Sequence, residues 1–316
     1  MSNLDARPTE TPCRAIEQAG PEARLLEARD VPLGGVRAMR VSRTLPQRTL
    51  PTVGAWCFLD RFGPERTDMV VPPHPHTGLQ TVTWPLHGEI RHRDSLGSDV
   101  VVRPSQLNLM TSGPGIAHSE ISLGEAPLLG GMQLWVALPD SGIGIAPAFE
   151  QHTDLPRFES DGVRGIVAVG ELGGAVSPAT AFTPLLGAQL EFDAGAKAAL
   201  PLRSDFEHAV LVLEGSLDVA GTPVEAGPLL YLGAGRDELP LSSTAGAKIF
   251  LLGGEPFPED LVMWWNFVGR SHDDIVAARE AWELHDQSRF GAVAGHGGER
   301  IPAPPIPPLR LNPRRR

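Results

Sequence analysis

The chain has 316 residues, of which 41% are hydrophobic, a proportion typical of a soluble globular protein. Its formal net charge of -11 argues against direct binding to nucleic acid, because a phosphate backbone attracts basic surfaces. Glycine and proline, at 35 and 31 residues, favour short strands and many turns over long helices. Cys13 and Cys57 are too few for a disulfide framework, and no segment reaches the roughly 18 apolar residues of a membrane span. A cytoplasmic location without membrane contact is therefore expected.

The first part of the chain predicts a loose arm followed by an all-β lobe. Residues 1–23 are polar and contain three prolines, as in a peripheral N-terminal arm. Residues 53–62 are almost continuously apolar, which indicates a strand buried on both faces. Short apolar runs separated by glycine and proline continue to about residue 142. We therefore predict a lobe over residues 24–142.

A metal-binding pattern lies inside this lobe. Residues 73–120 begin with a His-Pro-His sequence and end with a His-Ser-Glu sequence. In a β-strand, residues i and i+2 point to the same face, so each pair presents two ligands together. If the two strands lie side by side, four ligands converge on one ion. The predicted metal ligands are His74, His76, His118 and Glu120.

Residues 79–86 alternate between polar and apolar side chains, as expected of a strand. If this strand continues unbroken from the first histidine pair, Gln80, Val82 and Trp84 share the histidines' parity and face the interior. Gln80 could then orient a ligand. Pro85 cannot donate a ladder hydrogen bond, so it indicates a bulge or an edge.

The second half repeats this plan without the ligands. Residues 207–217 resemble residues 80–90, and on the same register Pro240 and Ser242 stand where the second ligand pair stands. We predict a second, similar β-barrel lobe over residues 143–291 that binds no metal. The two lobes together give an all-β protein of two jelly-roll β-barrels.

A C-terminal helix is predicted over residues 273–288, within the range of the second lobe. Ser271 or Asp273 can cap its start. Side chains that could form its buried face recur at spacings of three and four: Ile275, Ala278, Trp282 and His285. Residues 292–316 are rich in proline and form an extended tail.

A plain structural interpretation competes with the metal site, because a single histidine on a strand usually lies at the surface or in the core. However, five of the ten histidines fall between residues 74 and 118. Two of these, His87 and His92, are interpreted as a turn residue and as a structural residue, although His92 could also support a ligand. Three imidazoles and one carboxylate suit Fe(2+), and also Mn, Co, Ni, Cu or Zn. Glu120 could additionally take a proton from a substrate as a general base.

These motifs resemble the pirin family of bicupin proteins. The resemblance covers roughly residues 30–291 and rests on residues 73–120, Phe58–Pro64, Gly131–Val136 and Trp265–Val268. Family members hold one metal, usually iron, in the N-terminal cupin, through residues that match the four predicted ligands. Thr77, Leu79 and Pro85 depart from the usual family residues, and they concern the pocket rather than the ligands.

The resemblance implies two functions. The first is an Fe(2+)-dependent dioxygenase of the quercetin 2,3-dioxygenase type, with a flavonol and dioxygen as its substrates. The second is a non-enzymatic, iron- and redox-responsive regulator that binds a partner protein. Because cupin folds support many chemistries, the site has to decide between them.

Overall fold

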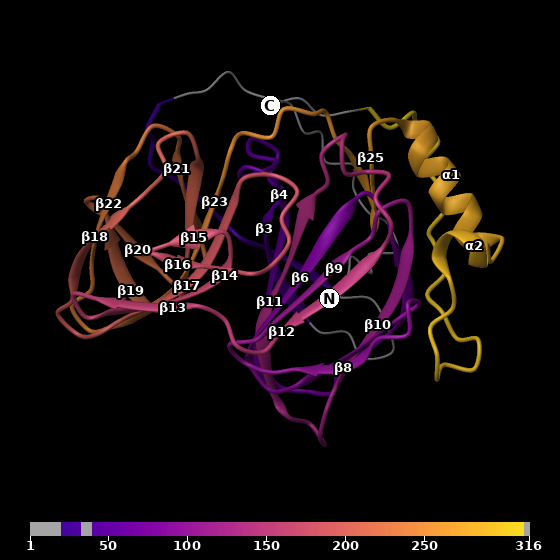
Figure 1. The fold of residues 1–316 in the computed structure, drawn as a ribbon, viewed down its shortest axis with the longest axis horizontal. Coiled ribbons are helices and arrows are strands. Elements are labelled where there is room, and N and C mark those ends of the chain that lie inside the picture. Colours follow the sequence, from indigo (N-terminus) through magenta and orange to yellow (C-terminus); the bar gives the residue numbers. More distant parts are fainter. Residues whose placement is uncertain (1–19, 33–39, 313–316) are drawn as a thin grey trace.

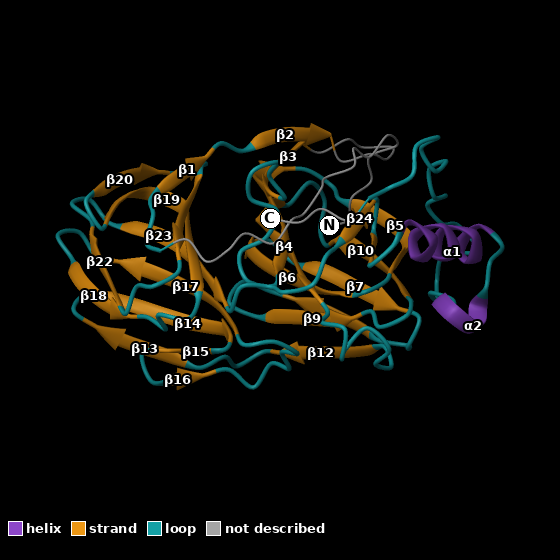
Figure 2. Ribbon diagram, turned by 90° about the horizontal axis from the view of Figure 1, so that it is seen from above, coloured by secondary structure: helices purple, strands orange, loops and turns teal. Residues whose placement is uncertain are grey.

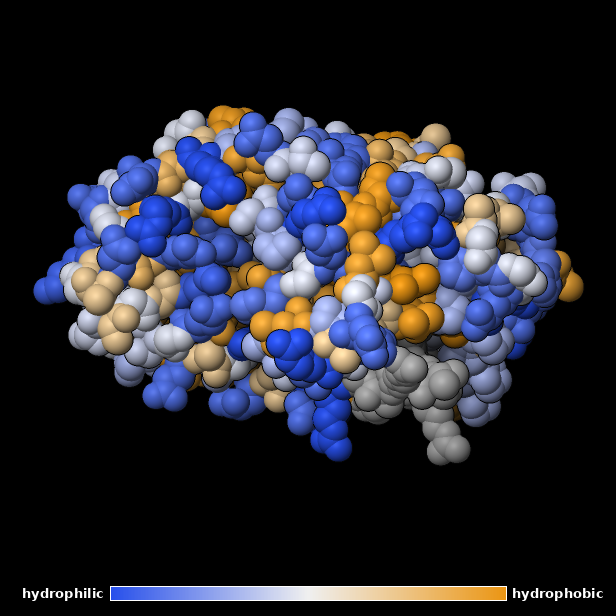
Figure 3. All heavy atoms as spheres, turned by 90° about the horizontal axis from the view of Figure 1, so that it is seen from below, coloured by the Kyte–Doolittle hydropathy of each residue, from blue (hydrophilic) through white to orange (hydrophobic). Residues whose placement is uncertain are grey.

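The computed structural model describes residues 20–32 and 40–312 and shows two lobes of β-sheet side by side (Figure 1). The predicted arm over residues 1–23 thus lies almost entirely outside the described residues. Within the described part of the chain, no helix is long and apolar enough to cross a membrane. On the face drawn in Figure 3, apolar side chains gather over the N-terminal lobe, while the C-terminal lobe presents a more hydrophilic surface.

The N-terminal lobe consists of two sheets. The four-stranded sheet has the order β5 (Val70–His76), β10 (Ile116–Ser122), β7 (Ile90–Asp94), β8 (Asp99–Val102). The seven-stranded sheet has the order β12 (Ala148–His152), β9 (Leu107–Thr111), β6 (Leu79–His87), β11 (Leu128–Ala137), β4 (Trp56–Arg66), β3 (Arg40–Leu45), β2 (Arg29–Pro32). The sheets stay separate and do not close into one barrel, so the all-β prediction is confirmed as a double sheet.

The C-terminal lobe contains one ten-stranded sheet and a small hairpin. The main path of the sheet runs β1 (Arg24–Leu26), β21 (Leu229–Gly233), β19 (Glu207–Val219), β23 (Ala247–Gly254), β17 (Leu185–Phe192), β14 (Val163–Val169), β13 (Arg157–Ser160). Three further strands, β18 (Lys197–Pro201), β20 (Thr222–Glu225) and β22 (Glu238–Ser242), pair beside it. The hairpin is β15 (Glu171–Leu172) with β16 (Ala175–Val176).

One cluster of the hydrophobic core extends across both lobes. A single cluster of buried side chains includes residues of both lobes, such as Leu134 and Leu211. Trp84 of β6 packs edge-on against Phe250 of β23, with ring centroids 5.8 Å apart. The Trp84 indole also donates a 2.9 Å hydrogen bond to Gln189 of β17. The lobes are therefore joined by apolar packing that includes specific polar contacts.

The predicted parity of β6 is wrong. Trp84 faces the other lobe, and Gln80 donates to the carbonyl oxygen of Thr180 at 3.0 Å, so this face of β6 points away from the histidines. The physical cause is Gly78, whose φ of +71° interrupts the alternation between β5 and β6. Thr83, of the opposite parity, faces the ligand side instead. The expected bulge at Pro85 is confirmed by a register shift in the pairing of β6 with β11.

Gly78 also lies against a hairpin that follows the C-terminal lobe in the sequence. This hairpin consists of β24 (Val262–Trp264) and β25 (Phe267–Gly269). A Cβ at Gly78 would lie 2.2 Å from the carbonyl oxygen of Val268, and Val268 donates to the carbonyl oxygen of Thr77 at 3.0 Å. The hairpin thereby fixes the bend that directly follows the first histidine pair.

Strand pairing crosses the predicted domain boundary in both directions. Strand β1, in the range predicted for the N-terminal lobe, pairs with β21 of the C-terminal lobe. Strand β12, in the range predicted for the C-terminal lobe, pairs with β9 of the N-terminal lobe. We propose that the division near residue 142 separates two lobes that each complete the other's sheet.

The predicted helix over residues 273–288 is in fact two helices, α1 (His272–Glu283) and α2 (Gln287–Phe290). Ser271 caps α1 as predicted, in a capping box with Asp274. His285 adopts a φ of +57°, and the Asp286 side chain then caps α2, which explains the interruption. Both helices lie at the outer end of the N-terminal lobe, although they follow the C-terminal lobe in sequence (Figure 2).

Candidate metal centre

The candidate site is built on three neighbouring strands of the four-stranded sheet, β5, β10 and β7. Strand β10 lies between β5 and β7, so that His118 stands opposite His74 on one side and Asp94 on the other. Glu120 stands opposite His92. Residues directly opposite in an antiparallel pair point to the same face, so alternation along β5 and β10 puts both ligand pairs on one face. A register shift in this pairing falls between His118 and Glu120.

Three of the four predicted ligands converge. The ligand nitrogens of His74, His76 and His118 all lie within 4.8 Å of one another. The Nε2 atoms of His76 and His118 are 3.1 Å apart. Two nitrogens bound at right angles to one ion, each at about 2.1 Å, would lie about 3 Å apart, so this spacing fits a metal ion.

Hydrogen bonding fixes which nitrogen His74 can offer. Nδ1 of His74 lies 2.8 Å from the carbonyl oxygen of Pro72. A carbonyl oxygen can only accept, so Nδ1 carries the proton and Nε2 keeps its lone pair. Burial lowers the pKa of His74 to about 4, and burial together with neighbouring imidazoles lowers the pKa values of His76 and His118 well below their usual value. All three rings are therefore neutral at pH 7, which is the metal-binding form.

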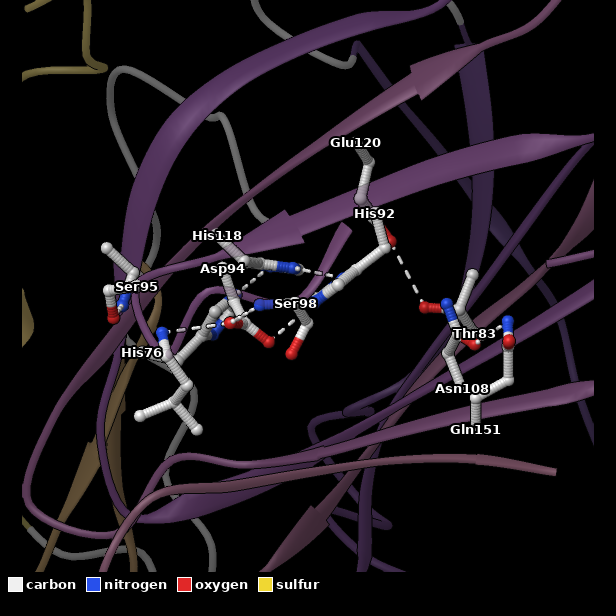
Figure 4. Close-up of polar contacts among 12 residues, drawn as sticks. His76, Thr83, His92, Asp94, Ser95, Ser98, Asn108, His118, Glu120 and Gln151 are labelled. Atoms are coloured by element: carbon white, nitrogen blue, oxygen red, sulfur yellow. Dashed lines mark hydrogen bonds and ion pairs between the residues drawn. The ribbon is translucent and has the colours of Figure 1, made fainter. Parts of the chain in front are cut away.

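His118 is oriented by two residues on β7 (Figure 4). The Asp94 carboxylate lies 3.1 Å from Nε2 of His92, and Nδ1 of His92 lies 3.3 Å from Nδ1 of His118. Burial alone would raise the pKa of Asp94, but hydrogen bonds from His92 and Ser98 outweigh it and lower that pKa. An ionised Asp94 accepts from Nε2–H of His92, so Nδ1 of His92 accepts from His118 and leaves Nε2 of His118 for a metal.

His92 therefore supports a predicted ligand, whereas the sequence favoured a purely structural role for it. Its ring is buried and stacks on Phe149 of β12, with centroids 4.4 Å apart. Asp94 was not among the predicted site residues. The His-Arg-Asp spacing at residues 92–94 places both side chains on one strand face, and that spacing was the signal that could have identified Asp94.

Glu120 lies on the ligand face but outside the cluster of three histidines. It is completely buried, and its Oε1 accepts a 3.1 Å hydrogen bond from the hydroxyl of Thr83 on β6. The same hydroxyl lies 3.2 Å from the side-chain oxygen of Gln133 on β11. Glu120 thus connects the four-stranded sheet to the seven-stranded sheet that faces it.

The second lobe lacks an equivalent cluster among the described residues. Strands β18 and β22 pair as β5 and β10 do, but Ala199 and Pro240 stand opposite one another where histidines would be needed. The group of three histidines in the N-terminal lobe is the one metal-capable cluster found in the described residues.

Comparisons with known proteins identify the family. The pirin profile matches residues 37–136, and the profile of the pirin C-terminal cupin domain matches residues 187–290. The chain belongs to the pirin family. This confirms the resemblance inferred from residues 73–120, and it confirms that the two lobes have a cupin-like fold.

Relatives of this pirin carry enzyme names. A Pseudomonas aeruginosa protein named "Putative quercetin 2,3-dioxygenase PA1205" is 47% identical over 284 residues, which cover 89% of each chain. A crystal structure of quercetin 2,3-dioxygenase from Acinetobacter baumannii is 39% identical, with a TM-score of 0.86, and the match covers 91% of this chain and 96% of that one. The Escherichia coli pirin YhhW, solved in complex with nickel(II), shares the fold at 16% identity and a TM-score of 0.60, with 75% and 100% coverage.

Proposed function

We propose that this pirin is an Fe(2+)-dependent dioxygenase of the quercetin 2,3-dioxygenase type. The observation that carries the proposal is the convergence of three neutral imidazoles beside a buried carboxylate. The Acinetobacter relative, at 39% identity over almost the whole chain, is titled as that enzyme and supports the choice of substrate class.

We assign His74, His76, His118 and Glu120 as the metal ligands. Three nitrogens and one oxygen suit a divalent ion of intermediate softness, and Mn, Co, Ni, Cu or Zn would fit the same donors. The nickel complex of YhhW supports a metal cofactor without selecting iron. A bound metal would polarise the flavonol's hydroxyl and carbonyl oxygens, or would bring the flavonol and dioxygen together.

The protein's own contribution is to orient the donors and to manage one proton. Glu120 takes the proton of the flavonol 3-hydroxyl as a general base, and Thr83 holds Oε1 of that carboxylate in place. The His92–Asp94 pair keeps Nε2 of His118 unprotonated. Burial of all four ligands, each at most 1% exposed, limits competing bulk water.

The decisive experiment is aerobic incubation of the iron-loaded protein with quercetin. We expect loss of the flavonol absorbance together with dioxygen consumption in the wild type. Glu120→Gln should retain part of the metal binding and lose turnover, because an amide cannot accept the proton. No turnover by the iron-loaded wild type would refute the dioxygenase assignment, and full turnover by Glu120→Gln would refute the role of Glu120.

The second candidate is a non-enzymatic regulator that binds a partner protein according to the redox state of the iron. Complete burial of the ligands favours it, since a sensor needs no open cavity at its metal. A pull-down from cytoplasm, the compartment we expect, should then recover different partners with ferrous and ferric protein. Identical partner sets would count against the regulator.

A further inference from the structure

Behind the metal strands, a segment near the C-terminus crosses the outer face of the four-stranded sheet. We call residues 291–301 the strap. The strap follows α2 and has no regular secondary structure. In Figure 1 this yellow segment runs beside β10, on the side away from the C-terminal lobe. The sequence predicted only an extended tail there.

The strap bonds to both strands that carry the candidate ligands. Nε2 of His296 lies 2.9 Å from Oγ of Ser119, in hydrogen-bonding range, and Ser119 stands between His118 and Glu120 on β10. The backbone N–H of Ile301 donates a 2.8 Å hydrogen bond to the carbonyl oxygen of Pro73, which precedes His74 on β5. Alternation along a strand places the Ser119 side chain on the reverse face from His118 and Glu120.

The strap also touches the third strand of the site. A Cβ at Gly295 would lie 3.0 Å from Nη1 of Arg93, which stands between His92 and Asp94 on β7. A Cβ at Gly291 would lie 2.6 Å from Cβ of Ser95, whose hydroxyl accepts from the N–H of Ala117 at 3.2 Å. The strap therefore reaches β5, β7 and β10 at residues adjacent to the site.

A cavity of about 170 Å³ separates the strap from this sheet elsewhere. Pro73, Ala117, Trp282 and His296 are among the residues that line it. Beside its hydrogen bonds, the strap packs Val293 and Ile301 against apolar clusters that include Ala117 of β10 and Val71 of β5. Six of its eleven residues are exposed, so the strap is held at a few points rather than along its whole length.

We propose that the strap positions the metal ligands, with His296 as the positioning residue that holds β10 through Ser119. A metal site must hold its ligands within about 0.5 Å of the right geometry. Ser119 and the two candidate ligands beside it share one short stretch of backbone, so a bond to Ser119 limits rotation of that strand. This inference rests on the proposed metal centre but not on the proposed substrate.

The test is the rate of metal release from the full-length protein. His296→Phe keeps a ring and removes the bond to Ser119, and His296→Gln restores a donor. The Co(II)-loaded variants are mixed with an excess of chelator, and release is followed by the Co(II) absorption bands. We expect His296→Phe to release cobalt five- to tenfold faster, with shifted bands, and His296→Gln to recover most of the wild-type rate and spectrum.

A control variant and a double variant separate positioning from general stability. His285 lines the same cavity and bonds Arg300 at 2.9 Å rather than a ligand strand, so His285→Asn should leave release unchanged. Ser119→Ala should match His296→Phe, and the double variant should be no faster than either, because both remove one bond. Thermal unfolding of the metal-free His296→Phe variant should stay near that of the wild type.

Three results would overturn the proposal: unchanged release in His296→Phe, equally faster release in His285→Asn, or a fall in metal-free stability that parallels the faster release. A wild-type protein that binds no cobalt would refute the metal centre and the strap's role together. Normal cobalt binding without flavonol turnover would refute the dioxygenase assignment alone.

Discussion

The Nδ1 atoms of His92 and His118 lie 3.3 Å apart, and this contact sets the tautomer of a candidate metal ligand. One of the two nitrogens must donate and the other must accept. Because Asp94 accepts from the far nitrogen of His92, the donor in this contact is His118. The Asp94 carboxylate, two hydrogen bonds away, thus determines that Nε2 of His118 carries the lone pair that faces the site.

Replacing Asp94 by Asn tests this relay. Oδ1 can still accept from the N–H groups of Leu96 and Ser98, while the amide replaces Oδ2 and donates towards Nε2 of His92. His92 then carries its proton on Nδ1 and donates to Nδ1 of His118. The proton of His118 moves to Nε2, the nitrogen that would bind the metal. We expect metal affinity, measured by calorimetry on metal-free protein, to fall about 10- to 100-fold.

The matched control for the relay is Asp99→Asn. Asp99 lies on the neighbouring strand β8 and pairs with Arg91 and Arg93 at the surface, away from the histidines. Its replacement should leave metal affinity unchanged. Equal affinities for wild type and Asp94→Asn would show that the relay does not determine the tautomer.

Thr83→Val tests the orientation of Glu120. The substitution keeps the shape of the side chain and removes the hydroxyl that donates to Oε1. A carboxylate without this hydrogen bond is less well oriented as a general base, so we expect flavonol turnover to fall about tenfold with a smaller change in metal affinity. Thr81→Val, two residues earlier on the same strand, is the control. Similar losses in both variants would indicate disturbed packing rather than a lost hydrogen bond.

The metal-free protein should lose stability below neutral pH. Burial lowers the pKa of His74 and of His208 to about 4, whereas an unfolded histidine titrates near 6.5. The unfolded state therefore binds more protons between these values, and the stability present above pH 6.5 is lost as pH falls towards 4. The loss should reach about 3 kcal/mol for each imidazole.

Urea unfolding at about pH 7.0, 5.5 and 4.5, of which the lower two lie between the two pKa values of about 6.5 and 4, measures this dependence. His208 lies in the C-terminal lobe and is completely buried, so it can be replaced without touching the metal centre. His208→Leu should reduce the slope of the unfolding free energy against pH, whatever the substitution does to stability at pH 7. A slope as steep as that of the wild type would rule out His208 as a contributor.

Gly78→Ala should destabilise the N-terminal lobe more than a positive φ alone explains. The new Cβ would meet the carbonyl oxygen of Val268 at 2.2 Å, in addition to the strain of a φ of +71°. Gly174 has a φ of +79° with no atom within 4 Å of a Cβ, so Gly174→Ala measures the strain by itself. We expect the free energy of unfolding, measured with urea, to fall by about 1 kcal/mol for Gly174→Ala and by about 3 kcal/mol or more for Gly78→Ala.

The shared face of His74 and His76 could be predicted because its geometry is local. Their convergence with His118 was predicted on the condition that the two strands lie side by side, and β5 and β10 do. A spacing of two along a strand places His74 with His76 on one face, whatever the rest of the fold does. The role of His92 could not be predicted in this way, because it depends on β7 pairing with β10 in one particular register. The sequence shows that His92 is present but not which residues lie beside it across the sheet.

Two errors arose where a single residue takes an unusual backbone conformation. The parity prediction passed through Gly78 as if the strand were continuous, and it therefore assigned Gln80 and Trp84 to the wrong face. The helix prediction passed through His285, whose left-handed φ ends the helical path after α1. Apolar periodicity is the same on both sides of such residues, so the pattern gave no warning.

The exchange of edge strands between the lobes has a consequence for how the molecule tolerates damage. The loop over residues 140–147 joins β11 to β12 and is partly exposed. A protease that cuts the backbone there would leave two fragments that remain associated, because β1 pairs with β21 of the C-terminal lobe while the helices and the strap lie against the N-terminal lobe. Purified alone, the first fragment would lack β12 of the seven-stranded sheet, and the second would lack β1 of the ten-stranded sheet.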